Sequence, residues 1–195
     1  MAIIEDLRNY FRRQRRYASF REAQNKGLKE LSAVRDLIEA MRRTVDDRLH
    51  SPEMGPDPNG APDCIALDTE ERRVALEVRE LVSQEAVVAN QHATSLLDAK
   101  YADWRPEGVI TEVDSILRQK DAKAYAGGPY VYIAVVIHTD EPTIDHDTYS
   151  RVLRARLFGP YNKVSRAYFL FSPQPQLGYS PYVSLRLCEP GTGQA

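Results

Sequence analysis

Residues 62–81, PDCIALDTEERRVALEVREL, contain the pattern that decides the fold of this chain. Two short runs rich in β-forming residues, CIALD (64–68) and RVALEVREL (73–81), are separated by the polar stretch 69–72. Two such runs joined by a few polar residues are typical of a β-hairpin. The sequence therefore predicts two neighbouring antiparallel strands here.

The second strand of this hairpin has two chemically different faces. Because alternate side chains of a strand share a face, Glu77 and Arg79 point the same way. The opposite face is apolar and consists of Val74, Leu76 and Val78. Pairing within the hairpin can bring Asp63, which comes just before the first strand, alongside Glu77.

The chain before the hairpin is predicted to be helical and then to form a loop. From residue 2 to about residue 47, apolar residues recur at helical spacing, which predicts one or two long helices. The clearest stripe consists of Leu28, Leu31, Val34, Leu37 and Met41. Residues 51–61 are rich in proline and glycine, which cannot continue a helix, so they predict a surface loop.

The chain after the hairpin alternates between helical and strand patterns. Residues 83–100 are compatible with a poorly periodic helix, and a clearer helix begins near Pro106 and ends before Gly127. The continuous apolar run 130–137 predicts a strand that is covered on both faces, at the centre of the sheet. The remaining expected elements are a helix over 147–158, a buried strand over 166–173 and an edge strand over 182–187.

Together these elements predict one α/β domain with a central mixed β-sheet flanked by helices. A length of 195 residues fits a single domain. Within residues 1–195 we expect an N-terminal helical segment (1–47), the proline- and glycine-rich loop (51–61) and an α/β core (62–188).

Composition narrows the class of function. The formal net charge is -2, so any contact with nucleic acid needs locally clustered arginine and lysine. Cys64 and Cys188 are the only cysteines and have apolar neighbours, which predicts reduced thiols in a reducing compartment. The N-terminal residues differ from a signal peptide and no apolar run reaches the length of a membrane span, so we expect a cytoplasmic protein without a membrane partner.

The predicted pairing of Asp63 with Glu77 indicates a metal site. Two adjacent carboxylates repel each other unless a cation lies between them, and Mg²⁺ is typically held by one or two carboxylates together with waters and phosphate oxygens. A bound metal polarises a phosphate and lowers the pKa of a water, while a nearby cation stabilises the charge that grows on the phosphate. The pattern therefore favours hydrolysis of a phosphodiester bond.

The motifs PDCIAL and VALEVREL resemble the proline–aspartate and strand-borne acid motifs of the PD-(D/E)xK nuclease superfamily. The resemblance covers roughly residues 62–138 and implies a restriction-endonuclease-like fold. It also implies cleavage of nucleic acid that depends on Mg²⁺ or Mn²⁺, with Asp63 and Glu77 as metal ligands. The expected substrate is DNA rather than RNA. The superfamily pattern has lysine two positions after the strand acid, but this chain has Arg79, which stays charged and is a poor proton acceptor.

Lys120 and Lys123 are the candidates for a relocated catalytic lysine, because some members of this superfamily take it from the following helix. The buried stripe of the predicted helix consists of Ile110, Val113 and Leu117. Lys120 follows that stripe by three residues, so it lies on or beside the face that packs against the sheet. Lys123 lies about one turn further along.

Each of these residues also has a structural interpretation. Asp63 suits a strand start after proline, and Glu77 suits an arginine-paired position on a half-buried strand. The position of Arg79 is equally compatible with two roles, as a structural partner of Glu77 and as a contact to phosphate. Lys120 and Lys123 fit the edge of an amphipathic helix from which their ammonium groups reach water.

Two further clusters combine residues of functional interest. The basic run RRQRR (12–16), flanked by aromatic residues, is compatible with phosphate and base contacts, although a solvated helix face explains it as well. The run Asp145-His146-Asp147 contains metal-ligand chemistry, but adjacent residues rarely converge on one ion. We therefore expect Asp145 or Asp147 to cap a helix.

Two other functions compete with a nuclease. In the first, replacement of the lysine by Arg79 marks a catalytically inactive nuclease-fold protein that binds nucleic acid or protein. In the second, residues 1–47 form a helical arm that mediates self-association as a homodimer, and the sheet serves as a scaffold.

Overall fold

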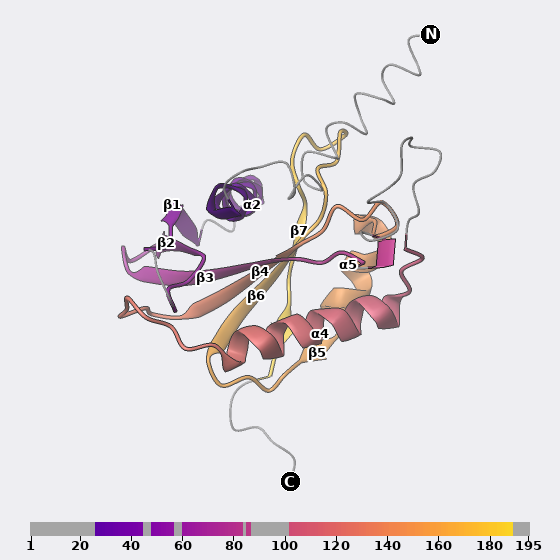
Figure 1. The fold of residues 1–195 in the computed structure, drawn as a ribbon. Coiled ribbons are helices and arrows are strands. Elements are labelled where there is room, and N and C mark those ends of the chain that lie inside the picture. Colours follow the sequence, from indigo (N-terminus) through magenta and orange to yellow (C-terminus); the bar gives the residue numbers. More distant parts are fainter. Residues whose placement is uncertain (1–25, 45–47, 57–59, 84, 87–101, 189–195) are drawn as a thin grey trace.

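The computed structural model describes residues 26–44, 48–56, 60–83, 85–86 and 102–188. In chain order these residues form α2 (Lys26–Arg43), β1 (Leu49–Met54), β2 (Cys64–Asp68), β3 (Arg73–Glu80), α4 (Pro106–Ala122), β4 (Ile133–His138), α5 (His146–Ala155), β5 (Leu157–Phe158), β6 (Val164–Leu170), β7 (Tyr182–Ser184) and β8 (Arg186–Leu187). Figure 1 shows a twisted sheet with helices on both sides, so the predicted α/β class is confirmed.

The main sheet is mixed and has the strand order β1-β2-β3-β4-β6-β7. β1, β2 and β3 pair antiparallel, which confirms the predicted hairpin. β3, β4 and β6 pair parallel, and β7 pairs antiparallel with β6 at the other edge. β4 thus has a partner on each side, as its continuous apolar sequence predicts. β5 and β8 pair separately as a two-stranded sheet.

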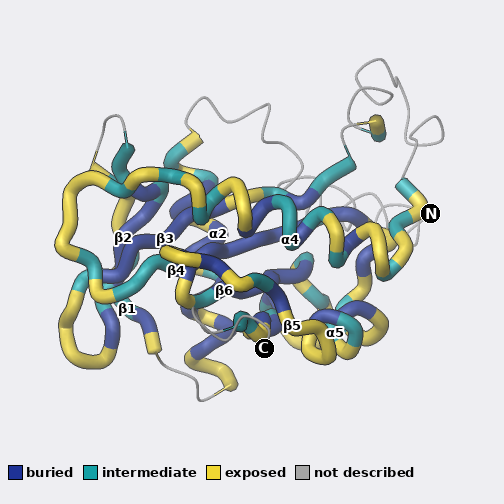
Figure 2. The backbone as a smooth tube through the Cα atoms, turned by 90° about the horizontal axis from the view of Figure 1, so that it is seen from below, coloured by how far each residue is buried: buried dark blue, intermediate teal, exposed yellow. Residues whose placement is uncertain are grey.

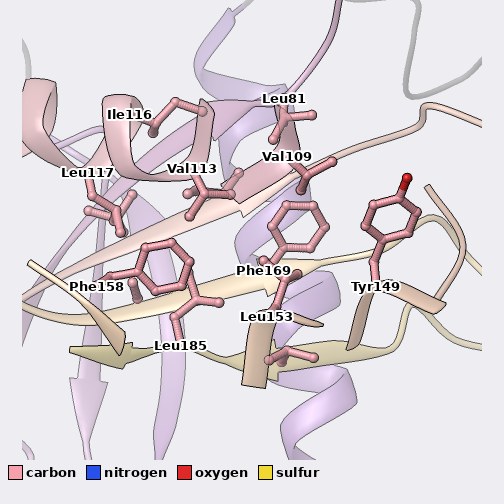
Figure 3. Close-up of a cluster of buried hydrophobic side chains, with 14 of the residues drawn as sticks. Leu81, Val109, Val113, Ile116, Leu117, Tyr149, Leu153, Phe158, Phe169 and Leu185 are labelled. Carbon is pink, nitrogen blue, oxygen red and sulfur yellow. The ribbon is translucent and has the colours of Figure 1, made fainter. Parts of the chain in front are cut away.

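Helices cover both faces of the main sheet (Figure 1), and an apolar layer is buried on each face. α2 packs over the face that carries Val74, Leu76 and Val78. α4 and α5 pack over the opposite face, where Figure 3 shows the apolar side chains of α4 facing Phe158 and Phe169. Each fully buried side chain of this size contributes about 1.5–3 kcal/mol to stability. Figure 2 shows the buried strands and the exposed connections between them.

The apolar stripe of α2 differs from the expected one at Leu28. Four of the five predicted residues, Leu31, Val34, Leu37 and Met41, are buried, but Leu28 is 54% exposed. Leu31 lies at the margin of the buried arc, and at about 100° per residue a position three residues earlier turns toward solvent. The rest of the expected N-terminal helical segment, including the run 12–16, lies outside the described residues. Self-association through residues 1–47 stays a prediction.

β1 occupies part of the stretch that the sequence indicated as a loop, so that prediction is wrong for residues 51–54. The pairing of β1 with β2 shifts register between His50 and Glu53, and Ser51 has a positive φ of 49°. Proline is tolerated at bulges and on edge strands, because the sheet does not need an N–H donor at those positions. Pro52 therefore does not end the strand.

Several element boundaries differ from those predicted. α4 begins at Pro106 as expected but ends at Ala122, because Lys123 takes up an extended backbone and the Tyr125 hydroxyl donates to the Lys120 carbonyl at 2.7 Å. α5 ends at Ala155, because the next residues pair with β8 as β5. The expected strand over 182–187 divides into β7 and β8. The expected helix over 83–100 lies largely outside the described residues.

The predicted cap of α5 is confirmed, whereas β4 and β6 are shifted by a few residues from the strands expected over 130–137 and 166–173. The Asp145 side chain accepts a hydrogen bond from the Thr148 N–H at 2.8 Å and so caps α5. Cys64 and Cys188 are both free thiols, the first buried and the second partly exposed. Among the described helices, none combines the length and apolar character needed to cross a membrane.

Candidate active site

The β2–β3 register brings the two predicted acids together. Cys64 pairs with Leu76, so the preceding residue, Asp63, lies opposite Glu77 at the end of the ladder. The Asp63 carboxylate is fixed on β3 as well, because its Oδ2 accepts a hydrogen bond from the Val78 N–H at 2.8 Å. Both acids therefore face the same region of the sheet, as the hairpin predicts.

Lys120 of α4 bridges these two carboxylates. Its ammonium lies 2.5 Å from Glu77 Oε2 and 3.2 Å from Asp63 Oδ2. The helix delivers this side chain because Val113 and Leu117 pack into the core on the side of α4 that faces the sheet. Lys120 therefore lies beside the sheet-facing side of α4, as its spacing from Leu117 predicts.

Lys123 reaches the other oxygen of Glu77. Its ammonium lies 2.5 Å from Glu77 Oε1 and donates to the carbonyl of Ala61 at 2.9 Å. Because Lys123 is the C-cap residue directly after α4, its side chain leaves the helix end where the chain turns toward β4. Glu77 thus accepts one ammonium at each carboxylate oxygen.

This four-residue network is partly buried and electrically balanced. The Glu77 side chain is 0% exposed, while those of Asp63, Lys120 and Lys123 are 14%, 19% and 30% exposed. Burial alone raises the pKa of Asp63, but the charge of Lys120 and the Val78 hydrogen bond outweigh it and leave that pKa below its usual value. Burial lowers the pKa of Lys120, and the carboxylates of Glu77 and Asp63 outweigh this and raise it. Two carboxylates and two ammonium groups together carry no net charge.

The segment before Asp63 is tightly held. The Gly55 N–H donates to the Asp63 carbonyl at 3.0 Å, and the Ala126 N–H donates to the Gly60 carbonyl at 2.7 Å. A Cβ at Gly55 would lie 1.8 Å from the Pro62 carbonyl oxygen, so only glycine fits there. The backbone around Asp63 is therefore fixed from both β1 and the α4–β4 connection.

Arg79 does not join this network, although the sequence made it a candidate. It is exposed, two residues beyond Glu77 on β3. Within the described residues, the ion pairs of Glu77 are made by Lys120 and Lys123 instead. The interpretation of Arg79 as a structural partner of Glu77 is therefore wrong. A contact between Arg79 and a phosphate stays a prediction.

Glu30 of α2 is a further acid near the site that the sequence analysis missed. It is 6% exposed and pairs with Lys26 at 3.2 Å. Burial raises its pKa, and the negative charge of Asp63 raises it further. The signal was present in the sequence, because Glu30 precedes Val34 and Leu37 by four and seven residues, which places an acid on the apolar face of a helix.

The site offers ligands of the type that a divalent cation prefers, although they do not form a preformed cage. Among the described residues, no three His, Cys, Asp or Glu side chains converge as they would around a metal ion. One or two carboxylates are enough for Mg²⁺ when phosphate oxygens and waters supply the rest, so Asp63 and Glu77 fit in number and chemistry. Lys120 lies between them and would have to move aside.

Comparison with known proteins leaves the site as the basis for a functional argument. No known protein family matches the chain, and no curated protein matches it significantly.

Proposed function

We propose that this chain is a metal-dependent nuclease that hydrolyses phosphodiester bonds in DNA, with Asp63 and Glu77 as ligands of Mg²⁺ or Mn²⁺. The observation that carries the proposal is the convergence of two carboxylates and two ammonium groups from distant segments, with Glu77 fully buried. Burying Glu77 completely and the other three charged groups partly costs desolvation energy, and charged clusters of this kind concentrate at functional sites. A restriction-endonuclease-like arrangement of the core belongs to the same proposal.

The residues of the network have distinct roles in this reaction. When bound, the metal would polarise the scissile phosphate and lower the pKa of a water. Lys120, next to both carboxylates, stabilises the negative charge that develops on the phosphate and orients the attacking water. Lys123 holds Glu77 in place and ties it to the Ala61 carbonyl.

The balanced charge of the network predicts that metal and substrate assist each other's binding. Without substrate, a divalent ion has to displace the ammonium of Lys120 and leaves the site with excess positive charge. A phosphate offers that ammonium an alternative partner and neutralises part of the excess. Metal affinity should therefore be higher in the presence of DNA.

The test is a cleavage assay with purified protein and DNA in Mg²⁺, in Mn²⁺ and in a chelator. Asp63→Asn and Glu77→Gln should abolish metal-dependent cleavage. Glu107→Gln, an exposed acid in the first turn of α4, is the matched control and should retain it. Full activity of both site variants, or no cleavage by the wild-type protein with either metal, would refute the proposal.

A catalytically inactive protein that binds nucleic acid or protein through the same fold is the second candidate. The observation in its favour is that Lys120 and Lys123 pair with the two acids and leave the network with no net charge. Calorimetric titration separates the two functions. Absence of Mg²⁺ and Mn²⁺ binding, both with and without DNA, together with salt-sensitive DNA binding, would favour this candidate.

A further inference from the structure

A row of cationic and aromatic side chains leads away from the candidate site. It begins with Lys123, whose ammonium lies 5.5 Å from the centre of the Tyr125 ring. It continues at the start of β3, where the Arg73 guanidinium lies 5.2 Å from the centre of the Tyr130 ring. We call these four residues, Lys123, Tyr125, Tyr130 and Arg73, the tyrosine ridge.

The ridge is one connected piece of structure. Arg73 donates a hydrogen bond to the Gly127 carbonyl at 3.0 Å, and Tyr130 donates to the Ala126 carbonyl at 3.0 Å. The α4–β4 connection is therefore fastened to the start of β3, beside which it passes in Figure 1. Most of this connection is exposed (Figure 2), and Val131 within it is 42% exposed.

The ridge is also aligned with the site. Arg73 and Glu77 are four residues apart on the same face of β3, which corresponds to about 13 Å along a strand. Lys123 belongs to both the ridge and the site, because its ammonium binds Glu77. A linear ligand that lies along the ridge would therefore extend to the carboxylates.

Additional positive charge lies next to the ridge. The Lys163 ammonium donates to the Lys123 carbonyl at 2.8 Å. The carboxylate of Asp121, which interacts electrostatically with Lys163, accepts hydrogen bonds from the backbone N–H groups of Asn162, Lys163 and Val164 and is held in that turn. The ridge thus presents cations to a ligand together with two tyrosine rings.

This combination suits one chemical class of ligand. Unpaired nucleic-acid strands bind through bases that stack on aromatic rings and phosphates that contact nearby cations. Duplex DNA keeps its bases stacked on each other, so it uses cations alone at such a surface. An acidic peptide would use the cations but would have no planar groups for the tyrosines.

We propose that the tyrosine ridge binds an unpaired DNA strand and guides it to Asp63 and Glu77. This rests on the proposed nuclease function and specifies its substrate as single-stranded DNA or the unpaired end of a duplex. The strand lies with bases against Tyr125 and Tyr130 and with phosphates at Arg73 and Lys163, while Lys123 keeps its contact with Glu77.

Fluorescence anisotropy with a labelled oligothymidylate, measured on the full chain in chelator to prevent cleavage, tests this inference. Tyr130→Leu should weaken binding about fivefold or more, whereas Tyr130→Phe, which keeps the ring, should bind like the wild type. Arg73→Ala should weaken binding and reduce the slope of log affinity against log salt by about 0.7. The thermal midpoint of each variant confirms that it is folded.

The matched control is the Arg43–Tyr179 pair, which has the same cation–aromatic chemistry, at 5.5 Å, and includes the last residue of α2 on the other side of the sheet. Arg43→Ala and Tyr179→Leu should leave oligothymidylate binding unchanged. The inference fails if Tyr130→Leu binds like the wild type, if the control variants lose as much affinity, or if a duplex or polyglutamate competes as well as oligothymidylate. Binding without cleavage in either metal refutes the nuclease proposal and leaves the ridge standing. Cleavage at an unchanged rate in the ridge variants refutes the ridge inference and leaves the nuclease proposal standing.

Discussion

Replacing Glu77 with glutamine tests the charge network most directly. Glutamine keeps the shape of the side chain but removes the charge that two ammonium groups share at 2.5 Å each. It also offers N–H donors to one of those ammonium groups. Breaking a buried ion pair from one side costs about 3–5 kcal/mol. Because Lys120 and Lys123 are 19% and 30% exposed and can turn toward water, we expect the lower end of that range, about 3 kcal/mol.

Differential scanning calorimetry in chelator measures this loss. For a chain of this length, 1 kcal/mol corresponds to roughly 2–4 °C in the thermal midpoint, so Glu77→Gln should lower it by about 6–12 °C. Glu39→Gln removes an exposed i,i+4 pair with Arg43 and is the control, with an expected loss of about 0.5 kcal/mol or less. A Glu77→Gln protein as stable as the wild type would show that the network contributes no net pairing energy.

The same variant reports on the metal. Mn²⁺ at ten times its dissociation constant should stabilise the wild-type protein by about 1.4 kcal/mol, which is roughly 3–6 °C. Glu77→Gln should lose this shift because one of the two ligands is gone. An equal shift in the variant would place the ion elsewhere.

Four further variants test the metal site, the pH dependence of stability and the two glycines. Lys120→Ala should be less stable than the wild type in chelator but should gain more from Mn²⁺ in calorimetry, because the bridging ammonium no longer competes with the ion; an unchanged Mn²⁺ affinity would contradict this. Burial and the charge of Asp140 raise the pKa of Glu80 to about 8, so the folded state keeps a proton that the unfolded state loses near pH 4.5. Stability should therefore fall as the pH rises between these values, and urea midpoints of Glu80→Gln should show a flatter profile. Gly55→Ala should cost about 1–3 kcal/mol and reduce cleavage, because its Cβ meets the Pro62 carbonyl. Gly108→Ala within α4, where the nearest atom is 3.8 Å away, should instead stabilise the protein by about 0.5–1 kcal/mol in the same urea assay.

The local parts of the site were predictable from sequence. The alternation in RVALEVREL places Glu77 opposite the apolar face, and a hairpin fixes its neighbour as Asp63. The spacing from Leu117 to Lys120 places a lysine beside the sheet-facing side of a helix. These inferences depend only on the periods of strand and helix.

Contacts between distant segments were not predictable in the same way. Pro52 gives a loop signal, and only the edge position of β1 makes it compatible with a strand. Helical spacing places Glu30 on the apolar face of α2, but the sequence does not show that this face brings the acid near Asp63. The candidacy of Arg79 relied on sequence spacing, whereas the structure gives both contacts with Glu77 to lysines from α4.

The origin of the four charged groups has a consequence for how this protein folds. Both acids belong to the β2–β3 hairpin region and both amines to the end of α4, so a hairpin that forms alone brings two negative charges together. Packing of α4 against the sheet removes that repulsion and, in the same step, buries the apolar side of the helix. Helix docking and completion of the chemical centre are thus a single event, and a chain with α4 detached would possess neither a finished core nor a usable site.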